Sequence, residues 1–214
     1  MRTAILTDFI SHDPAYSLCS VVANQAKMLA GEDLTLYVRK GFDPTEASKV
    51  YGRGRVGTLG GVGVFDPGET GSNVVNVTPD SEAEIASLEA QFEEHLADKD
   101  VVLTHDLIYQ PNMWKYHVAA RRFAPKHPNV RWLHWVHSST DLGTAVQTGR
   151  FASELRGRFP NSHLVAMHEE EINRKGGMFG PIRPAFNTVA ATCTTGPVCR
   201  SPVSRTSARG TKSG

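Results

Sequence analysis

The sequence predicts an α/β protein built on a Rossmann-like parallel sheet flanked by helices. Short apolar runs alternate with longer stretches of helical periodicity along most of the chain. Roughly six of these runs are strand candidates, and a strand, helix, strand order implies parallel strands joined by a right-handed crossover. Polar clusters follow several runs, which is typical of a sheet that binds its ligand at the carboxyl ends of its strands.

The first elements form one βαβ unit. Residues 3–7 (TAILT) are the first strand, and a polar loop containing Pro14 follows them. Ser17 is the expected N-cap of a helix whose apolar residues recur at helical spacing, and Gly31 is expected to end it. Residues 34–38 (LTLYV) are the second strand.

The next part of the chain has a weaker pattern. Residues 41–71 are rich in glycine and are expected to be a flexible or irregular surface segment, with at most a short strand at 62–65. They are not interpreted as a phosphate-binding loop, because that fingerprint must stand directly between a strand and a helix. Residues 73–77 (NVVNV) are the third strand candidate.

Clearer elements follow. Ser81 and Glu84 form a capping box that opens a helix, with an apolar face at residues 85, 88, 92 and 96. The central stretch, residues 100–139, reads as strand 101–104, helix 111–123 and strand 130–136. A short helix at 151–159, a strand at 162–167 and a helix at 168–175 complete the pattern.

Residues 1–180 are therefore expected to be one Rossmann-like domain, and residues 181–214 a separate kind of segment. The latter contain no Asp or Glu and show no useful periodicity. Such a segment buries too little apolar surface to offset its ordering entropy, so we expect it to be disordered. The abrupt change indicates a truncated or frame-shifted end, with a natural tail as the alternative.

Composition limits the classes of function. The 214 residues carry a formal net charge of +1, which gives no electrostatic basis for binding nucleic acid. No apolar run reaches the roughly 18 residues of a membrane span, and no leader pattern opens the chain. The three cysteines form no C-x-x-C pattern, so a cytoplasmic protein without a disulfide framework is expected.

Three polar clusters follow strand candidates and are expected to meet at one edge of the sheet. They are Ser11-His12-Asp13, His105-Asp106 and His137-Ser138-Ser139. No metal site is expected. His168 lacks a second histidine at the H-E-x-x-H spacing, and Cys193 and Cys199 have no partner histidine nearby.

Two of these turns carry a resemblance to a known family. Thr104-His105-Asp106-Leu107 is similar to the His-Asp-Trp turn of GT-B-fold retaining glycosyltransferases of the glycogen and sucrose-phosphate synthase group. The run Leu133 to Ser138 (LHWVHS) is similar to the second histidine turn of that family. Residues 2–180 thus resemble the N-terminal, acceptor-side domain, which is one half of a GT-B fold.

The resemblance implies roles for the clustered residues. His137, Asp106 and His105 would be catalytic: His137 would contact the reacting sugar, and His105 and Asp106 would orient an acceptor hydroxyl, with Asp106 as a base. Ser11, His12, Asp13 and Ser138 would bind substrate. The partner would be a sugar or glycosylated acceptor.

The same resemblance implies that a nucleotide sugar is the co-substrate. The family holds it on a second domain through two glutamates eight positions apart, and no such pair occurs in this sequence. The chain itself is expected to need no cofactor, and to be inactive without the second domain.

Other interpretations stay open from the residues alone. His137 fits a strand-end histidine bonded to backbone, Asp106 fits a cap of the following loop, and His12 with Asp13 fits an ordinary turn before Pro14. His134 is expected to pack within the sheet. The alternative function is a non-catalytic Rossmann-like binding or partner module. A dinucleotide-dependent oxidoreductase ranks last, because the first βα turn lacks G-x-G-x-x-G.

Overall fold

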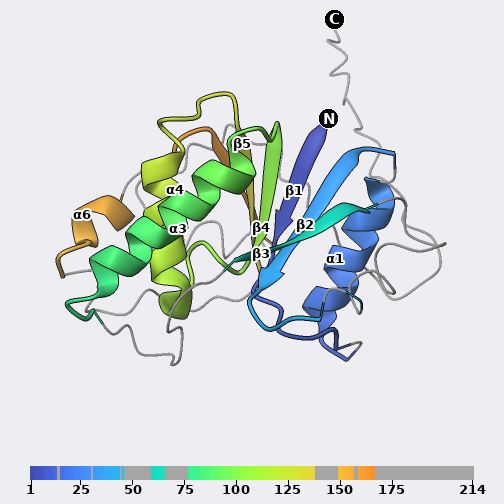
Figure 1. The fold of residues 1–214 in the computed structure, drawn as a ribbon, viewed down its shortest axis with the longest axis horizontal. Helices are drawn as coiled ribbons and strands as arrows, with labels where there is room; N and C mark the ends of the chain where they lie inside the picture. Colours follow the sequence, from blue (N-terminus) through green and yellow to red (C-terminus); the bar gives the residue numbers. More distant parts are fainter. Residues whose placement is uncertain are drawn as a thin grey trace, which may run out of the picture.

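A parallel sheet organises the chain, as Figure 1 shows. The computed structural model describes residues 1–13, 15–29, 31–43, 45, 59–65, 77–137, 149–156 and 159–166. Within them lie six strands in the order β3-β2-β1-β4-β5-β6, all paired in parallel. This is the doubly wound order, whose winding reverses between β1 and β4. The expected α/β class with a Rossmann-like sheet is confirmed.

The elements alternate along the chain as the periodicity indicated. In order they are β1 (Arg2–Leu6), α1 (Ser17–Met28), β2 (Asp33–Arg39), β3 (Leu59–Phe65), α3 (Ser81–Leu96), β4 (Val101–His105), η2 (Pro111–Met113), α4 (Trp114–Phe123), β5 (Arg131–Val136), α6 (Ala152–Leu155) and β6 (Ser162–Ala166).

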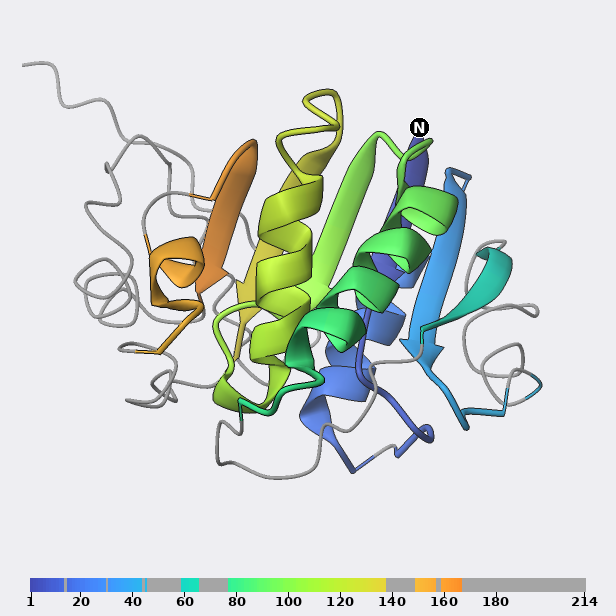
Figure 2. The ribbon, with the colours of Figure 1, turned by 60° about the vertical axis from the view of Figure 1, so that its left-hand side comes forward.

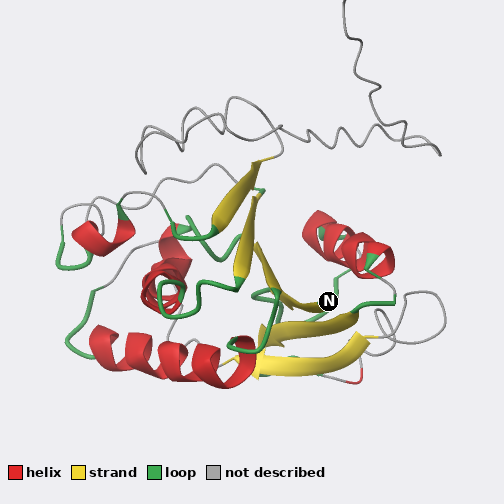
Figure 3. Ribbon diagram, turned by 90° about the horizontal axis from the view of Figure 1, so that it is seen from above, coloured by secondary structure: helices red, strands yellow, loops and turns green. Residues whose placement is uncertain are grey.

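Helix α1 covers one face of the sheet, and Figure 3 shows it alone on that side among the described helices. Its apolar stripe, Leu18, Val22 and Ala26, packs on Ile5 of β1 and on alternate residues of β2. Leu103 of β4 belongs to the same cluster. Because side chains alternate along a strand, His105 lies on this α1 face as well.

Helices α3, α4 and α6 cover the other face. Phe92 of α3, Phe123 of α4 and Trp132 of β5 form the aromatic centre of that core, with ring centroids 6.0–6.4 Å apart. His134 points to the same side as Trp132, is 0% exposed and is hydrogen-bonded to Thr104 Oγ1 at 2.9 Å through Nδ1. Its expected packing within the sheet is confirmed.

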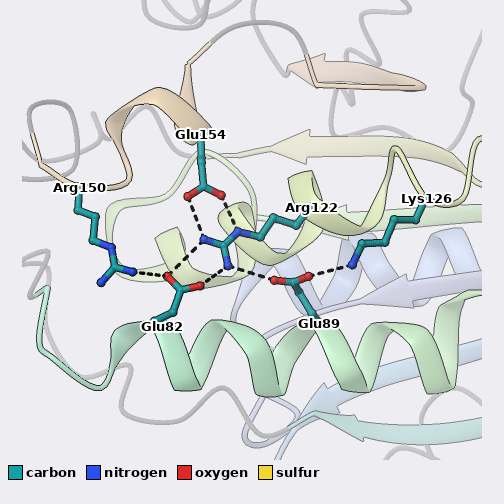
Figure 4. Close-up of polar contacts among 6 residues, drawn as sticks. All are labelled: Glu82, Glu89, Arg122, Lys126, Arg150 and Glu154. Atoms are coloured by element: carbon teal, nitrogen blue, oxygen red, sulfur yellow. Dashed lines mark hydrogen bonds and ion pairs between the residues drawn. The ribbon is translucent and has the colours of Figure 1, made fainter.

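A network of charged side chains joins the three helices of this layer (Figure 4). Arg122 of α4 donates to Glu154 of α6 (Nε–Oε2, 2.5 Å) and to Glu82 of α3 (NH1–Oε1, 2.5 Å). Glu89 of α3 also accepts from Arg122 at 3.2 Å. These carboxylates raise the pKa of the Arg122 guanidinium. Arg122, whose side chain is only partly exposed, therefore links α6 and α3 to α4.

Ser17 and Ser81 were expected to be the N-caps of α1 and α3, and both predictions are wrong. Tyr16 is the N-cap of α1, and Asp80 is the N-cap of α3, and neither side chain caps its helix. Ser81 is the first helical residue, and its Oγ accepts a hydrogen bond from Thr78 N at 2.9 Å. The hydroxyl thus closes the preceding turn, so it does not form the capping box.

The glycine-rich segment contains more strand than the pattern indicated. Residues 59–65 form β3, which pairs with β2 from Leu34 to Arg39, whereas a strand only at 62–65 was expected. Ladder hydrogen bonds use backbone groups, so glycines can pair where a side-chain pattern is weak. Two other elements are shorter than expected. The helix expected at 151–159 is Ala152–Leu155, and Val77, expected to end a strand, lies outside any strand.

Several expectations fall on residues outside the described ranges. They are the irregular character of most of 41–71, strand residues 73–76, Ser138, the helix at 168–175 and the segment 181–214. Within the described part of the chain, no helix has the length and apolar character needed to cross a bilayer.

Candidate functional site

The carboxyl ends of β1, β4 and β5 lie next to one another at one edge of the sheet. Strand β4 pairs with β1 on one side and with β5 on the other, and Figure 2 shows the strand arrows running to the same edge. The β1–β4 boundary is the point where the winding reverses, which is where doubly wound folds leave a crevice for ligands. The residues just after these three strands are therefore the candidate site.

Two histidines that lie 32 positions apart in the sequence meet at this edge. His105 ends β4 and His137 follows β5, and His105 Nδ1 lies 3.1 Å from His137 Nε2. Their ring planes are 23° from parallel, with centroids 5.3 Å apart. The ring of Trp135, two residues before His137, lies nearly parallel to both, with centroids 5.9 and 6.1 Å away. The sequence predicted that these histidine turns converge, and the structure brings them together.

His105 is held as a neutral ring inside the protein. Its side chain is 1% exposed, and burial, followed by the charge on His137, lowers its pKa from 6.5 to about 3. Its Nε2 lies 2.7 Å from Gln25 Oε1 of α1. A ring so enclosed acts on a ligand only through His137.

Asp106 holds the site together. Its Oδ1 accepts from the backbone N–H of His137 at 2.8 Å and from Gln110 Nε2 at 3.1 Å. Its own N–H donates to Trp135 O at 3.0 Å, and its φ of 49° lies in the left-handed region that Asp tolerates better than most residues. The loop-capping interpretation describes these contacts, and a role as base stays a prediction.

The first polar cluster lies in the loop between β1 and α1. Asp13 Oδ1 accepts from Ala15 N at 2.8 Å, and Tyr16 N donates to Asp13 O at 3.0 Å, so Asp13 organises the turn before α1. Ser11 and Asp13 are exposed and His12 is half-buried. Within the described ranges, neither Ser11 nor Asp13 hydrogen-bonds to the histidine pair. Ser138 lies outside those ranges.

Two further residues of this edge were not singled out from the sequence. Burial raises the pKa of Tyr16, and the nearby charges of Asp106, Cys19 and Asp8 raise it further. Tyr16 thus lies within electrostatic range of carboxylates that follow β1 and β4, on both sides of the reversal point. Asp8 directly follows the first expected strand, residues 3–7, so the same strand-end rule that found Asp106 would have found it.

The Asp8 carboxyl group is in an unusual environment. Burial raises its pKa from 3.8 to about 6, and the positive charge of Arg39 partly opposes this. Its Oδ2 lies 3.7 Å from Arg39 NH1, and its Oδ1 is buried with no hydrogen-bond partner in the part of the chain that the structure describes. A carboxyl group with such a pKa exchanges its proton near neutral pH.

Gln25 was also missed. It is only 8% exposed and lies on the apolar stripe of α1 beside Val22 and Ala26. A polar residue at a position where helical periodicity predicts an apolar one is the signal that would have found it. Its partner, His105, is 80 positions away, and nothing in the sequence links the two.

The chemistry available at this edge is acid–base and hydrogen-bonding chemistry. A half-buried imidazole (His137), a carboxyl group with a raised pKa (Asp8) and a phenol (Tyr16) are present, together with the indole of Trp135. Among the described residues, no group of three or more His, Cys, Asp or Glu side chains is arranged to hold a metal ion.

In comparisons with known proteins, no protein-family model matches the chain, and no curated protein sequence matches it significantly. The case for a function therefore comes from the residues of this edge.

Proposed function

We propose that this edge binds a sugar, and that the chain is the acceptor-side domain of a glycosyltransferase that uses a nucleotide-sugar donor. The observation that carries the proposal is the hydrogen-bonded pair of His105 and His137 beside the reversal point of the sheet. These are the histidines of the two turns that resemble the glycosyltransferase family. The proposal gains support because the two turns are neighbours in space.

His137 is the proposed sugar contact. A neutral imidazole accepts or donates one hydrogen bond to a hydroxyl group, and the indole of Trp135 beside it supplies the aromatic surface that sugar C–H groups favour. His105 is 1% exposed, so in this proposal it positions His137 and does not touch the sugar. Asp106 holds the backbone of His137 in register with β4.

The remaining roles follow from the resemblance. Ser11, His12, Asp13 and Ser138 are the proposed substrate-binding residues of the adjoining loops, and Asp106 is the proposed base. The nucleotide sugar is held by a second domain, so the chain alone binds its acceptor and transfers no sugar.

A sugar titration tests the proposal. Amide and tryptophan side-chain NMR signals of the full chain are followed while mono- and disaccharides are added. We expect weak binding, with Kd of about 1 mM, and shifts concentrated on residues 105–110 and 135–137. His137→Ala is expected to abolish the shifts.

His127→Ala is the matched control, because His127 is paired with Glu93 in the turn after α4, before β5. It is expected to bind sugar as the unchanged chain does. If no sugar shifts the signals of the edge, or if His137→Ala binds as well as His127→Ala, the sugar-binding proposal is wrong.

A non-catalytic binding module is the second candidate. The burial of His105 and the use of Asp106 Oδ1 in holding His137 favour it, because both residues then serve structure and not chemistry. Under this candidate, a ligand binds with equal strength to the unchanged chain and to His137→Ala.

A further inference from the structure

We propose that Gln25 is a positioning residue that sets the direction of the hydrogen bonds through the His105–His137 pair, so that His137 carries its proton on Nε2 and its lone pair on Nδ1. The tautomers follow from contacts within this chain alone. Their consequence for a sugar hydroxyl rests on the proposed function.

The first step is the contact between Gln25 and His105. The oxygen of a side-chain amide only accepts, so Nε2 of His105 carries the proton in the 2.7 Å contact with Gln25 Oε1. Both side chains are buried, at 8% and 1% exposure, so water does not compete for this hydrogen bond.

The orientation of the Gln25 amide decides the direction, and the distance favours the oxygen. A separation of 2.7 Å is at the short end of the range for N–H···O bonds, whereas the N···N separation between the two histidines is 3.1 Å. In this orientation Gln25 Nε2 is buried and has no hydrogen-bond partner among the described residues. If the amide were reversed, the Gln25 oxygen would be the buried atom without a described partner.

The second step concerns the far side of His105. Burial keeps its ring neutral, so a proton on Nε2 leaves a lone pair on Nδ1. The 3.1 Å contact to His137 then requires Nε2 of His137 to donate. A neutral His137 with its proton on Nε2 has its lone pair on Nδ1.

The third step is the fixed position of His137. Its backbone N–H donates to Asp106 Oδ1 at 2.8 Å, and its ring lies beside those of His105 and Trp135, with centroids 5.3 and 6.1 Å away. The ring therefore keeps the orientation in which Nε2 faces His105. A ligand that donates a hydrogen bond, such as a hydroxyl group, suits Nδ1, whereas a group that only accepts does not.

The test is a direct measurement of tautomers in the full chain. Long-range ¹H–¹⁵N NMR correlations of the imidazole rings, at a pH where both rings are neutral, distinguish protonated from unprotonated nitrogens. We expect His105 and His137 both to carry the proton on Nε2. A proton on Nδ1 of His137 overturns the proposal.

Gln25→Met removes the amide and keeps the unbranched shape of the side chain. Without the acceptor, His105 loses the preference for a proton on Nε2, so we expect a mixture of tautomers at His137. Asn24→Leu, on the exposed side of the same helix, is the matched control and is expected to keep the original tautomers. An unchanged His137 tautomer in a folded Gln25→Met chain contradicts the proposal.

The two proposals fail separately. If no sugar binds but His137 carries its proton on Nε2, the role of Gln25 stands and the sugar assignment falls. If sugar binds and His137 carries its proton on Nδ1, the reverse holds. Should Gln25→Met fail to fold, the spectrum of the unchanged chain decides.

Discussion

Asp106 Oδ1 accepts the backbone N–H of His137 at 2.8 Å, so a side chain from the turn after β4 fixes the chain where β5 ends. The backbone N–H of Asp106 donates to Trp135 O at 3.0 Å and extends the pairing of the two strands by one residue. His105 and His137 are thereby held at hydrogen-bonding distance. The geometry of the histidine pair depends on this aspartate.

Replacing Asp106 with Ala is expected to destabilise the protein and release His137. The change removes two hydrogen bonds to Oδ1 and puts a less tolerant residue at a φ of 49°. Together these effects cost about 3 kcal/mol of unfolding free energy. Urea unfolding measures the loss, and the ring signals of His137 report its release.

Asp106→Asn is the control for that change, because Asn keeps an acceptor oxygen and also tolerates a positive φ. It is expected to lose about 1 kcal/mol or less. Equal losses for Ala and Asn would mean that the two hydrogen bonds contribute nothing.

Stability is expected to fall as the pH falls from 7 to 5. Burial lowers the pKa of His105 and of His134 from 6.5 to about 3. At pH values between 6.5 and 3, the unfolded chain therefore binds two protons that the folded chain does not bind. Asp8 acts in the opposite direction, because its raised pKa lets the folded chain bind a proton first. The net loss is on the order of 2–3 kcal/mol. Guanidinium unfolding at both pH values measures it.

His134→Asn isolates one of the two histidines. Asn can keep the hydrogen bond to Thr104 Oγ1 but does not titrate. The dependence of stability on pH is expected to become weaker in this variant. A stability that does not change between pH 7 and pH 5 in the unchanged chain would show that the two rings take up protons while folded.

Asp8→Asn is expected to stabilise the protein at pH 8. There the unchanged chain holds an ionised carboxylate whose Oδ1 is buried without a hydrogen-bond partner among the described residues, and its pKa of about 6 reflects the cost of burying that charge. A neutral amide of the same shape removes that cost, for a gain of about 2 kcal/mol. The gain is expected to shrink at pH 5, where the carboxyl group is largely protonated.

Asp33→Asn is the matched comparison, because Asp33 is exposed at the start of β2. Thermal unfolding of both variants at pH 8 and pH 5 checks the prediction. A loss of stability at pH 8 on replacing Asp8 would mean that its ion pair with Arg39, at 3.7 Å, outweighs the burial.

Arg122→Met is expected to loosen α6. The arginine is the common partner of Glu82, Glu89 and Glu154, and without it three carboxylates face one another (Figure 4). We expect a loss of about 2 kcal/mol at low salt and a smaller loss at 1 M salt, where the repulsion is screened.

Arg2→Met serves as the comparison for Arg122→Met, because the Arg2 side chain is 51% exposed. It is expected to have a much smaller effect on urea unfolding. Equal effects of the two changes, at either salt concentration, would show that the Arg122 network adds no stability.

The elements with strong periodicity were predictable because their signals are local. Leu18 and Val22 of α1, and Ile85, Leu88 and Phe92 of α3, are buried on the faces that helical spacing indicates. Met28, which was assigned to the same pattern in α1, is exposed. The apolar runs became β1, β2, β4, β5 and β6 for the same reason. Hydrophobic period alone identifies such segments, and their alternation makes the sheet parallel.

The features that sequence reasoning missed depend on distant partners. β3 forms from a glycine-rich run because β2 offers its backbone groups for pairing, and Gln25 is buried on α1 with His105, 80 positions away, as its partner. Which distant groups pair is decided only in the folded chain.

The residue pattern was enough to predict the α/β class, most elements and the two strand-end histidines of the edge. The tertiary structure decided the order β3-β2-β1-β4-β5-β6, and with it which strand ends become neighbours. It also decided that His105 is buried against Gln25 while His137 remains half-exposed. Periodicity is a property of near neighbours in the chain, whereas burial and hydrogen-bond direction arise from groups 32 and 80 positions apart.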